Sequence, residues 1–217
     1  MLAKKLFVFG GKLHQYLEDT TYAIHGLLSL IGDEEARLLD LQSQLEASRN
    51  ERGHAESILF VGAPPSGFGE DTTPYFEKRA RDAGQKIAEL ERSITPLQAA
   101  IDAKAFSVRA LAGAILQVAK QGIVVAHGGM AQCPPGKRLG SETLKNVVWE
   151  GRNQAMHWDE GRYNQPVIAC FANLECDFGP QFSLGGSPAS SLAKAVIDLL
   201  KWTEFDVYMS DMHSLLG

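Results

Sequence analysis

Apolar residues recur at heptad-like spacing through the first part of the chain, and this pattern predicts a long helix. The stripe has misses at Thr20 and Glu34. Its weak point is Gly32-Asp33, where Asp33 can cap a second segment, so the pattern fits one long helix or two collinear ones. We expect the helix to fade near Arg52-Gly53. The apolar positions are Leu17, Ile24, Leu27, Ile31, Leu38, Leu41 and Leu45.

A second stripe, between residues 87 and 118, predicts a second long helix. Pro96 predicts a kink or short break in it, because proline removes one backbone hydrogen bond and clashes with the preceding turn. Residues 60–74, rich in glycine and proline, predict a loop. Two helices that each carry an apolar stripe and are joined by a loop can bury these stripes against each other, so we expect an antiparallel helical hairpin. The second stripe contains Ile87, Leu90, Ile94, Leu97, Ile101, Val108, Leu111, Ile115 and Val118.

The rest of the chain predicts a turn followed by shorter helices. The turn covers residues 133–138, and a third helix is predicted from a cap at Ser141 to about Trp158, with Gly161 as its stop. Residues 167–174 are too few to decide between helix and strand. Ser187 before Pro188 predicts the cap of a last helix, whose apolar positions continue to Tyr208.

Length and composition favour a single globular domain. The 217 residues are 45% apolar and 22% charged, a mixture typical of soluble proteins that bury a core without disulfides or metal. We expect an all-α helical bundle over 1–217, with about 33–100 as a projecting antiparallel hairpin and about 105–217 completing the bundle. No stretch approaches about 18 uncharged apolar residues. The apolar run at the N-terminus is too short for a signal peptide, so we expect a cytoplasmic protein that does not bind membranes.

The net charge and the cysteine content limit which ligands and which cellular compartment fit the chain. The net charge of −5 argues against a broad basic face for nucleic acid but leaves room for a local site. Three cysteines without a CxxC pair fit a reducing compartment. His157 has no second histidine at i+4, and the adjacent Asp159 and Glu160 point in different directions. We therefore expect neither a metal nor a cofactor.

The segment 149–161 carries the strongest candidate for chemistry. Arg152-Asn153 is followed by His157 in the pattern R-N-x-x-x-H, among apolar residues. The pattern resembles the R-[polar]-x-x-x-H signature of HEPN domains, small all-helical bundles of many metal-independent ribonucleases in toxin–antitoxin, abortive-infection and CRISPR systems. The resemblance implies a HEPN-like bundle, endoribonuclease activity in bacterial defence or a toxin system, RNA as the substrate, and a homodimer that pairs two motifs.

The resemblance also implies roles for the motif residues. Arg152 would hold the scissile phosphate, His157 would transfer the proton, and Asn153 would orient the histidine or bind a phosphate oxygen. On an undistorted helix Arg152 and His157 are about 140° apart, so the helix has to end near His157 or a second chain has to complete the site. The flanking cations are candidate substrate-binding residues: Lys137, Arg138, Lys145 and Arg162.

The same strict pattern occurs a second time, at Arg49-Asn50 and His54. This copy lies at the polar end of the first predicted helix, beside Gly53. Whether it marks a second site or is a coincidence stays open at the level of sequence. The copy at 152–157 is the better candidate, because a preorganised site needs a supporting apolar shell.

A structural interpretation of the motif also stays open. In that case Arg152 bridges Glu150 or Asp159, and His157 is a packed histidine at a helix end. The chain is then a non-catalytic interaction module whose hairpin stripe binds a protein partner. Nucleotide sensing by the same bundle is a third and weaker hypothesis.

Overall fold

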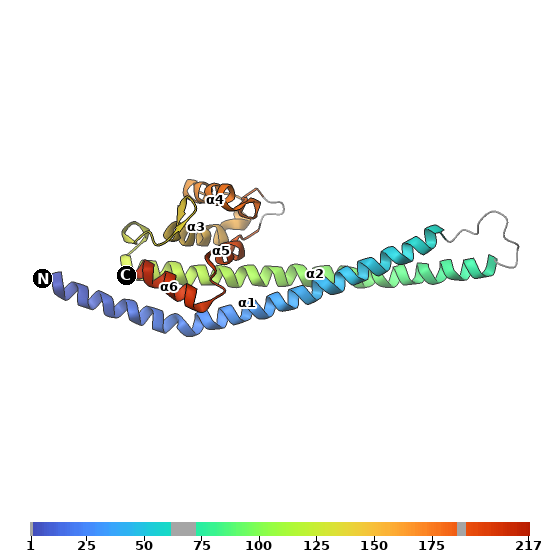
Figure 1. Ribbon diagram of the computed structural model, residues 1–217, viewed down its shortest axis with the longest axis horizontal. Coiled ribbons are helices and arrows are strands. Elements are labelled where there is room, and N and C mark those ends of the chain that lie inside the picture. Colours follow the sequence, from blue (N-terminus) through green and yellow to red (C-terminus); the bar gives the residue numbers. More distant parts are fainter. Residues whose placement is uncertain (1, 62–72, 186–189) are drawn as a thin grey trace. The chain divides into compact units, whose positions relative to one another are not determined.

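The computed structural model describes residues 2–61, 73–185 and 190–217, and it confirms an all-α protein (Figure 1). The strands are two residues each and pair antiparallel, with Arg138 opposite Thr143 and Leu139 opposite Glu142. The helices are α1 (Leu2–Val61), α2 (Thr73–His127), α3 (Leu144–His157), α4 (Gln165–Phe178), α5 (Ala193–Leu200) and α6 (Phe205–Leu216). The strands are β1 (Arg138–Leu139) and β2 (Glu142–Thr143), and 3-10 helices occur at Met130–Gln132, Trp158–Glu160 and Pro180–Phe182.

The chain divides into two compact units. Unit 1 contains Met1–Asp33 and Ser107–Gly217, and unit 2 contains Glu34–Phe106. Unit 2 covers most of the region in which the hairpin is predicted. Unit 1 adds the first half of α1 to the C-terminal region that carries the R-N-x-x-x-H motif.

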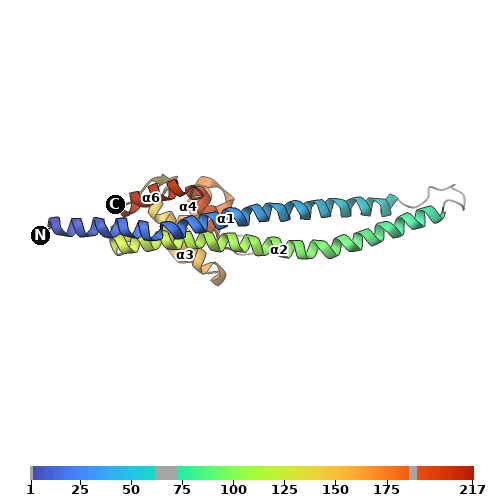
Figure 2. The same ribbon diagram turned by 90° about the horizontal axis from the view of Figure 1, so that it is seen from below.

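In unit 2, α1 and α2 form an antiparallel hairpin (Figure 2). Leu45, Leu90 and Ile101 from the predicted stripes are buried. Two ion pairs join the helices across the hairpin. The Nζ of Lys104 lies 2.8 Å from a carboxylate oxygen of Glu34, and that of Lys86 lies 2.9 Å from one of Glu51.

The structure corrects the expected end of the first long helix and narrows the expectation at Pro96 in the second. The helix α1 does not fade at Arg52-Gly53 but continues to Val61. The glycine costs only about 1 kcal/mol of helix propensity, and Ala55 beyond it is buried in unit 2. Of the kink or short break expected at Pro96, the break is absent, because α2 continues through this exposed proline as a helix. The apolar stripe on both sides of Pro96 supports the helix through tertiary packing.

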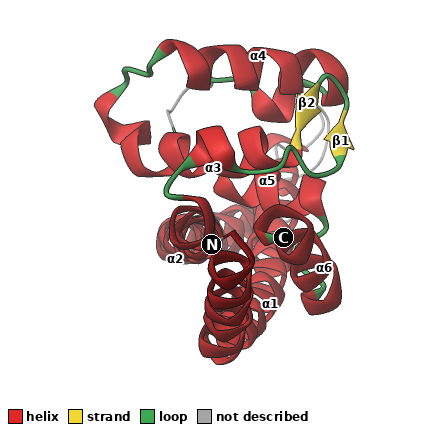
Figure 3. Cartoon of the chain, turned by 90° about the vertical axis from the view of Figure 1, so that its left-hand side faces the viewer, coloured by secondary structure: helices red, strands yellow, loops and turns green. Residues whose placement is uncertain are grey.

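Unit 1 holds the main hydrophobic core. Here α3 lies between α4 on one side and α2 and α5 on the other (Figures 1 and 3). Its buried face includes Val147 and Val148, and the largest fully buried side chain is Trp202, between α5 and α6. The other large, fully buried core side chains of this unit include Ile24, Ile115, Leu116, Ile123, Leu144, Phe171, Leu174, Phe182, Ile197 and Tyr208.

Side chains of α1 and α6 pack closely against α2 at Gly122. A Cβ at this position would lie 2.9 Å from Cε1 of Tyr16, 3.1 Å from Cε of Met212 and 3.3 Å from Cδ1 of Leu216. At these distances a side chain at position 122 requires its neighbours to shift. The hydroxyl of Tyr16 also donates a hydrogen bond to the backbone oxygen of Val118 at 2.7 Å, which ties α1 to α2 beside the glycine.

We expect Gly122→Ala to lower the free energy of unfolding by about 1 to 3 kcal/mol, because the added methyl overpacks this contact. The matched control is Gly113→Ala in the same helix, where the nearest side-chain atoms to a new Cβ are 3.7 Å away. That change should stabilise the protein by up to about 1 kcal/mol through helix propensity. Urea unfolding followed by circular dichroism measures both, and equal effects would contradict the close packing at Gly122.

The third helix starts later than the sequence predicts. Thr143, not Ser141, is the N-cap residue of α3. Ser141 instead follows the left-handed Gly140, and its backbone N–H and hydroxyl donate hydrogen bonds to Asp177 Oδ2 at 2.7 and 2.6 Å. These bonds, with Arg138 nearby, lower the pKa of Asp177. Ser141 is therefore a turn residue that joins the strand pair to α4.

The C-terminal region shows which structure residues 167–174 adopt, and it corrects the expectation of a single last helix. Residues 167–174 are helical, within α4, whose N-cap Asn164 accepts a hydrogen bond from the N–H of Val167 at 3.1 Å. The expectation of a single last helix is wrong, because Lys201 adopts a left-handed conformation (φ 59°) and separates α5 from α6. The predicted cap at Ser187-Pro188 and most of the predicted loop lie outside the described residues.

The helical segment Pro74–His127 contains a stretch that is long and apolar enough, by length and composition alone, to cross a membrane. About two fifths of it, 39%, is buried inside the protein. The core helix of a soluble protein meets the same test, and α2 supplies Ile115, Leu116 and Ile123 to the core of unit 1. The stretch is therefore weak evidence for a membrane span and is compatible with a soluble protein.

Candidate functional site

The R-N-x-x-x-H motif occupies the last turns of α3, which ends at His157. The helix is held in place by its buried face, and Gly151 allows its close approach to α2 and α5. A Cβ at Gly151 would lie 3.2 Å from Cγ1 of Val196 and 3.5 Å from Cδ1 of Leu116. A 3-10 turn follows the helix and ends at Gly161, which is left-handed (φ 63°), as expected for a stop. The apolar packing therefore fixes the backbone that carries the motif.

His157 pairs with a carboxylate three residues further along. Its Nδ1 lies 2.6 Å from Oε1 of Glu160, and its side chain is 49% exposed. When Nδ1 donates to the carboxylate, Nε2 becomes the ring nitrogen that can exchange a proton with a ligand. The pair therefore provides the chemistry of a general acid or base at the surface of the protein.

The pair borders a small polar pocket of about 270 Å³. Asn153 and Arg162, both predicted from the sequence, line it together with His157. Tyr163 lies at its edge, where its hydroxyl oxygen accepts a hydrogen bond from the buried Gln154 at 3.3 Å. The full lining is Asn153, His157, Glu160, Arg162, Tyr163, Asn164 and Val167.

Arg152 is directed to α2 and is not part of this lining. Its Nε donates a hydrogen bond to Oε1 of Gln117 at 2.5 Å. The structural interpretation expected an ion pair with Glu150 or Asp159, but the partner in the structure is this neutral amide. Asn153 connects the two environments: its Oδ1 accepts a hydrogen bond from Lys120 at 2.7 Å, and its Nδ2 donates to Glu150 at 3.0 Å. The motif thus has one side at the pocket and the other at α2.

The remaining predicted substrate-binding residues do not line the pocket. Lys137 pairs with the buried Asp211 at 2.7 Å. Lys145 donates to the backbone oxygen of Cys133 at 2.9 Å, and Arg138 donates to that of Ser141 at 3.0 Å. The structure therefore brings together Asn153, His157 and Arg162 but places these three cations in other contacts.

Sequence reasoning missed the contacts of Glu160, Gln117 and Lys120, since it considered Glu160 only as a metal ligand and did not consider the other two. Glu160 had a signal, because a residue three positions after His157 can meet it across the turn that follows the helix. The two α2 residues had none, since they lie more than 30 positions away from the residues they contact. Only the packing of α3 on α2 reveals them.

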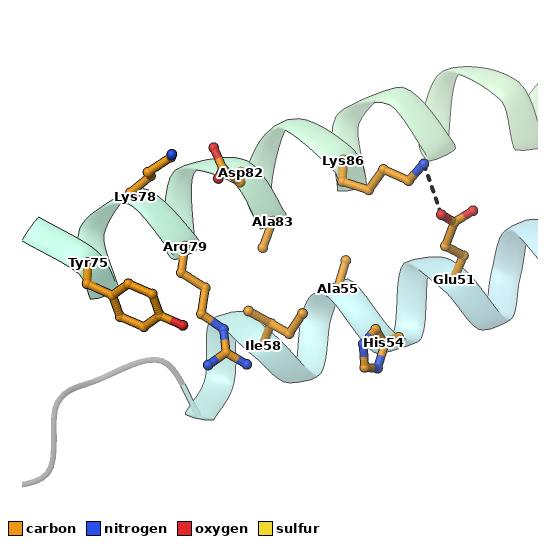
Figure 4. A pocket seen from close by; sticks show the side chains of 10 residues that line it. All are labelled: Glu51, His54, Ala55, Ile58, Tyr75, Lys78, Arg79, Asp82, Ala83 and Lys86. Atoms are coloured by element: carbon orange, nitrogen blue, oxygen red, sulfur yellow. Dashed lines mark ion pairs between the residues drawn. The ribbon is translucent and has the colours of Figure 1, made fainter.

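The other copy of the motif lies in unit 2, on α1 (Figure 4). Arg49 donates a hydrogen bond to the side chain of Gln98 at 3.1 Å. His54 borders a separate pocket of about 530 Å³, whose walls include Ala55 and Ala83 facing each other from the two helices and Arg79 reaching across from α2 (Figure 4). His54 has no short contact with a carboxylate among the described residues, unlike His157.

The described residues offer little for metal or thiol chemistry. No group of three or more His, Cys, Asp or Glu side chains in the described part of the chain is placed to hold a metal ion. All three cysteines are free, and Cys133 and Cys170 are buried. Burial, together with the negative charges of Glu142 and Glu150, raises the pKa of Cys170 to about 12, so its thiol stays protonated.

The fold defines an all-α protein with a helical bundle and a helical hairpin. Comparisons with protein-family models, with curated proteins and with solved structures gave no match to this chain. The assignment of a function therefore depends on the site itself.

Proposed function

We propose that the chain is a metal-independent endoribonuclease of HEPN type. The observation that carries the proposal is the 2.6 Å contact between Nδ1 of His157 and Oε1 of Glu160 at a pocket that also contains Asn153 and Arg162. A half-exposed histidine oriented by a carboxylate is suited to act as a general acid or base. Arginine beside it is suited to a phosphodiester.

In this proposal the 2′-hydroxyl of the ribose attacks the adjacent phosphorus. The bond from the 2′-oxygen to phosphorus forms, and the bond from phosphorus to the 5′-oxygen breaks, which leaves a 2′,3′-cyclic phosphate. His157 accepts the proton of the 2′-hydroxyl through Nε2, and Glu160 stabilises the resulting imidazolium. Arg162, which lines the pocket together with His157, offsets the charge that develops on the phosphate oxygens.

The departing 5′-oxygen needs a proton from a second group. In the homodimer that the resemblance implies, His157 of a second copy supplies it across the two-fold interface. The protein then acts in the cytoplasm, in a defence or toxin system of the kind in which HEPN ribonucleases are found.

The test is cleavage of a mixed single-stranded RNA by the purified full chain in excess EDTA. Products that end in 2′,3′-cyclic phosphate, and that are lost in His157→Ala, would support the proposal. Absence of cleavage by the folded dimer, or cleavage that His157→Ala leaves unchanged, would contradict it.

A second candidate is a non-catalytic interaction module whose motif is structural. It is favoured by one observation: Arg152 and Asn153 form hydrogen bonds that tie α3 to α2. In that case the hairpin binds a protein partner, and the motif serves only to hold the bundle together.

Arg152→Ala separates these two functions. If Arg152 is structural, its loss should lower the free energy of unfolding by about 1.5 to 3 kcal/mol, the usual cost of a hydrogen bond to a charged group. If Arg152 also binds phosphate, the rate of RNA cleavage per folded molecule falls as well, whereas a purely structural Arg152 leaves that rate unchanged. Urea unfolding and RNA cleavage, measured on the same preparation, distinguish the two outcomes.

A further inference from the structure

Lys120 lies on α2, but its ammonium group is held over the motif on α3. Its Nζ donates a hydrogen bond to Oδ1 of Asn153 at 2.7 Å and lies 4.3 Å from the ring centroid of Trp149. A cation at this distance from an indole face is held by the ring as well as by the amide. Because Asn153 lines the pocket that contains His157, Lys120 is one hydrogen bond away from the proposed active site.

A second cation, Arg152, belongs to the same contact between α2 and α3. It precedes Asn153 on α3, and its partner Gln117 lies three residues before Lys120 on α2. Burial and then the positive charge of Arg152 lower the pKa of Lys120, while Glu150 opposes the effect. Within the described ranges, neither Lys120 nor Arg152 forms an ion pair with a carboxylate, and Nε of Arg152 is engaged by the neutral Gln117. Two positive charges held at the same contact between α2 and α3 cost free energy, and a bound anion recovers that cost.

We infer that Lys120 and Arg152 together bind one phosphate of single-stranded RNA. The inference rests on the proposed function and adds to it a phosphate-binding residue from a different helix. The two groups complement each other, since the guanidinium offers its remaining nitrogens as a planar fork and the ammonium acts as a compact point charge. The bond between Lys120 and Asn153 links this phosphate to the pocket in which His157 would transfer the proton.

The test measures RNA binding without cleavage. The full chain is titrated with a fluorescent single-stranded RNA that carries 2′-O-methyl groups, which removes the attacking hydroxyl, and affinity is measured over a range of salt concentrations. Each phosphate contact to a single strand contributes about 0.7 to the slope of log K against log salt. We expect Lys120→Met to weaken binding and make the slope less steep by about 0.7, while Lys120→Arg keeps the slope.

Lys201→Gln is the charge-matched control, because Lys201 is exposed and follows α5 in the same unit. It should leave the slope unchanged. Thermal unfolding checks that each variant is folded. If Lys120→Met is unstable, Lys120→Arg still tests the inference, because this variant keeps the positive charge. A slope of log K against log salt that becomes less steep in Lys120→Arg would contradict a role that needs only the charge. RNA binding with the same slope in Lys120→Met would overturn this inference alone, whereas no RNA binding by the unaltered chain would overturn the proposed function as well.

Discussion

His157→Ala is expected to lower kcat/KM for RNA cleavage by about 10²- to 10⁴-fold, the usual contribution of a positioned general acid or base. The stability of the fold should change little, because the histidine side chain is 49% exposed and its contact with Glu160 lies at the surface. Cleavage of single-stranded RNA in EDTA gives the rate, and circular dichroism gives the folded fraction of each preparation.

Two histidines serve as matched controls for this change. His213→Ala removes an exposed histidine from α6 in the same unit, and His54→Ala removes the histidine of the other motif copy in unit 2. Both variants should keep the activity of the unaltered chain. Equal losses in His157→Ala and His54→Ala would show that the pairing with Glu160 is not what defines the site.

Trp202→Ala is expected to cause the largest loss of stability, about 3 to 5 kcal/mol in the free energy of unfolding. Trp202 is fully buried and meets the ring of Tyr208 edge to face, with 4.9 Å between centroids. Its Nε1 donates to the buried Asp211 at 2.8 Å, and the same carboxylate oxygen accepts from Lys137 at 2.7 Å. The substitution therefore leaves a cavity and removes one of the two bonds to a buried charge.

The controls for this prediction vary the exposure and the chemistry of the lost ring. Tyr22→Ala removes an aromatic side chain that is 89% exposed, and it should change stability by no more than about 0.5 kcal/mol. Trp202→Phe keeps most of the apolar volume and should cost less than the alanine variant. Similar urea midpoints for Trp202→Ala and Tyr22→Ala would contradict the assignment of Trp202 to the core.

The placement of the motif explains why stability and activity can be tested separately. The backbone of α3 is fixed by its buried face, including Val147, Val148 and Gly151. His157 and Glu160 follow at the end of the helix, where the chain turns and the side chains are exposed. A change in this exposed pair should therefore alter chemistry while the core that positions it stays intact.

Much of the fold was predictable because helical periodicity is a local property. The two apolar stripes predicted the long helices, and Gly161 predicted a stop that the structure confirms with a left-handed residue. Expectations failed where a local signal was overruled by packing: Gly53 does not end α1, and Ser141 does not cap α3. The division of the last helix at Lys201 was also missed, because a left-handed lysine has no signature in the sequence.

The candidate site was only partly predictable. Asn153, His157 and Arg162 were singled out from the sequence and are found around one pocket. Lys137, Arg138 and Lys145 were chosen because they flank the motif in the chain, and proximity in sequence does not determine where a long side chain points once the loop before α3 has folded. Their contacts are with Asp211, Ser141 and Cys133 instead.

The sequence by itself determined the helical class, the two long helices and the segment that holds the candidate site, because periodicity and motif spacing are properties of neighbouring residues. The tertiary structure decided which groups surround that segment. Lys120 and Gln117 meet Asn153 and Arg152 only because α3 packs against α2, and such contacts between distant residues follow from the burial of apolar faces, which no local pattern specifies.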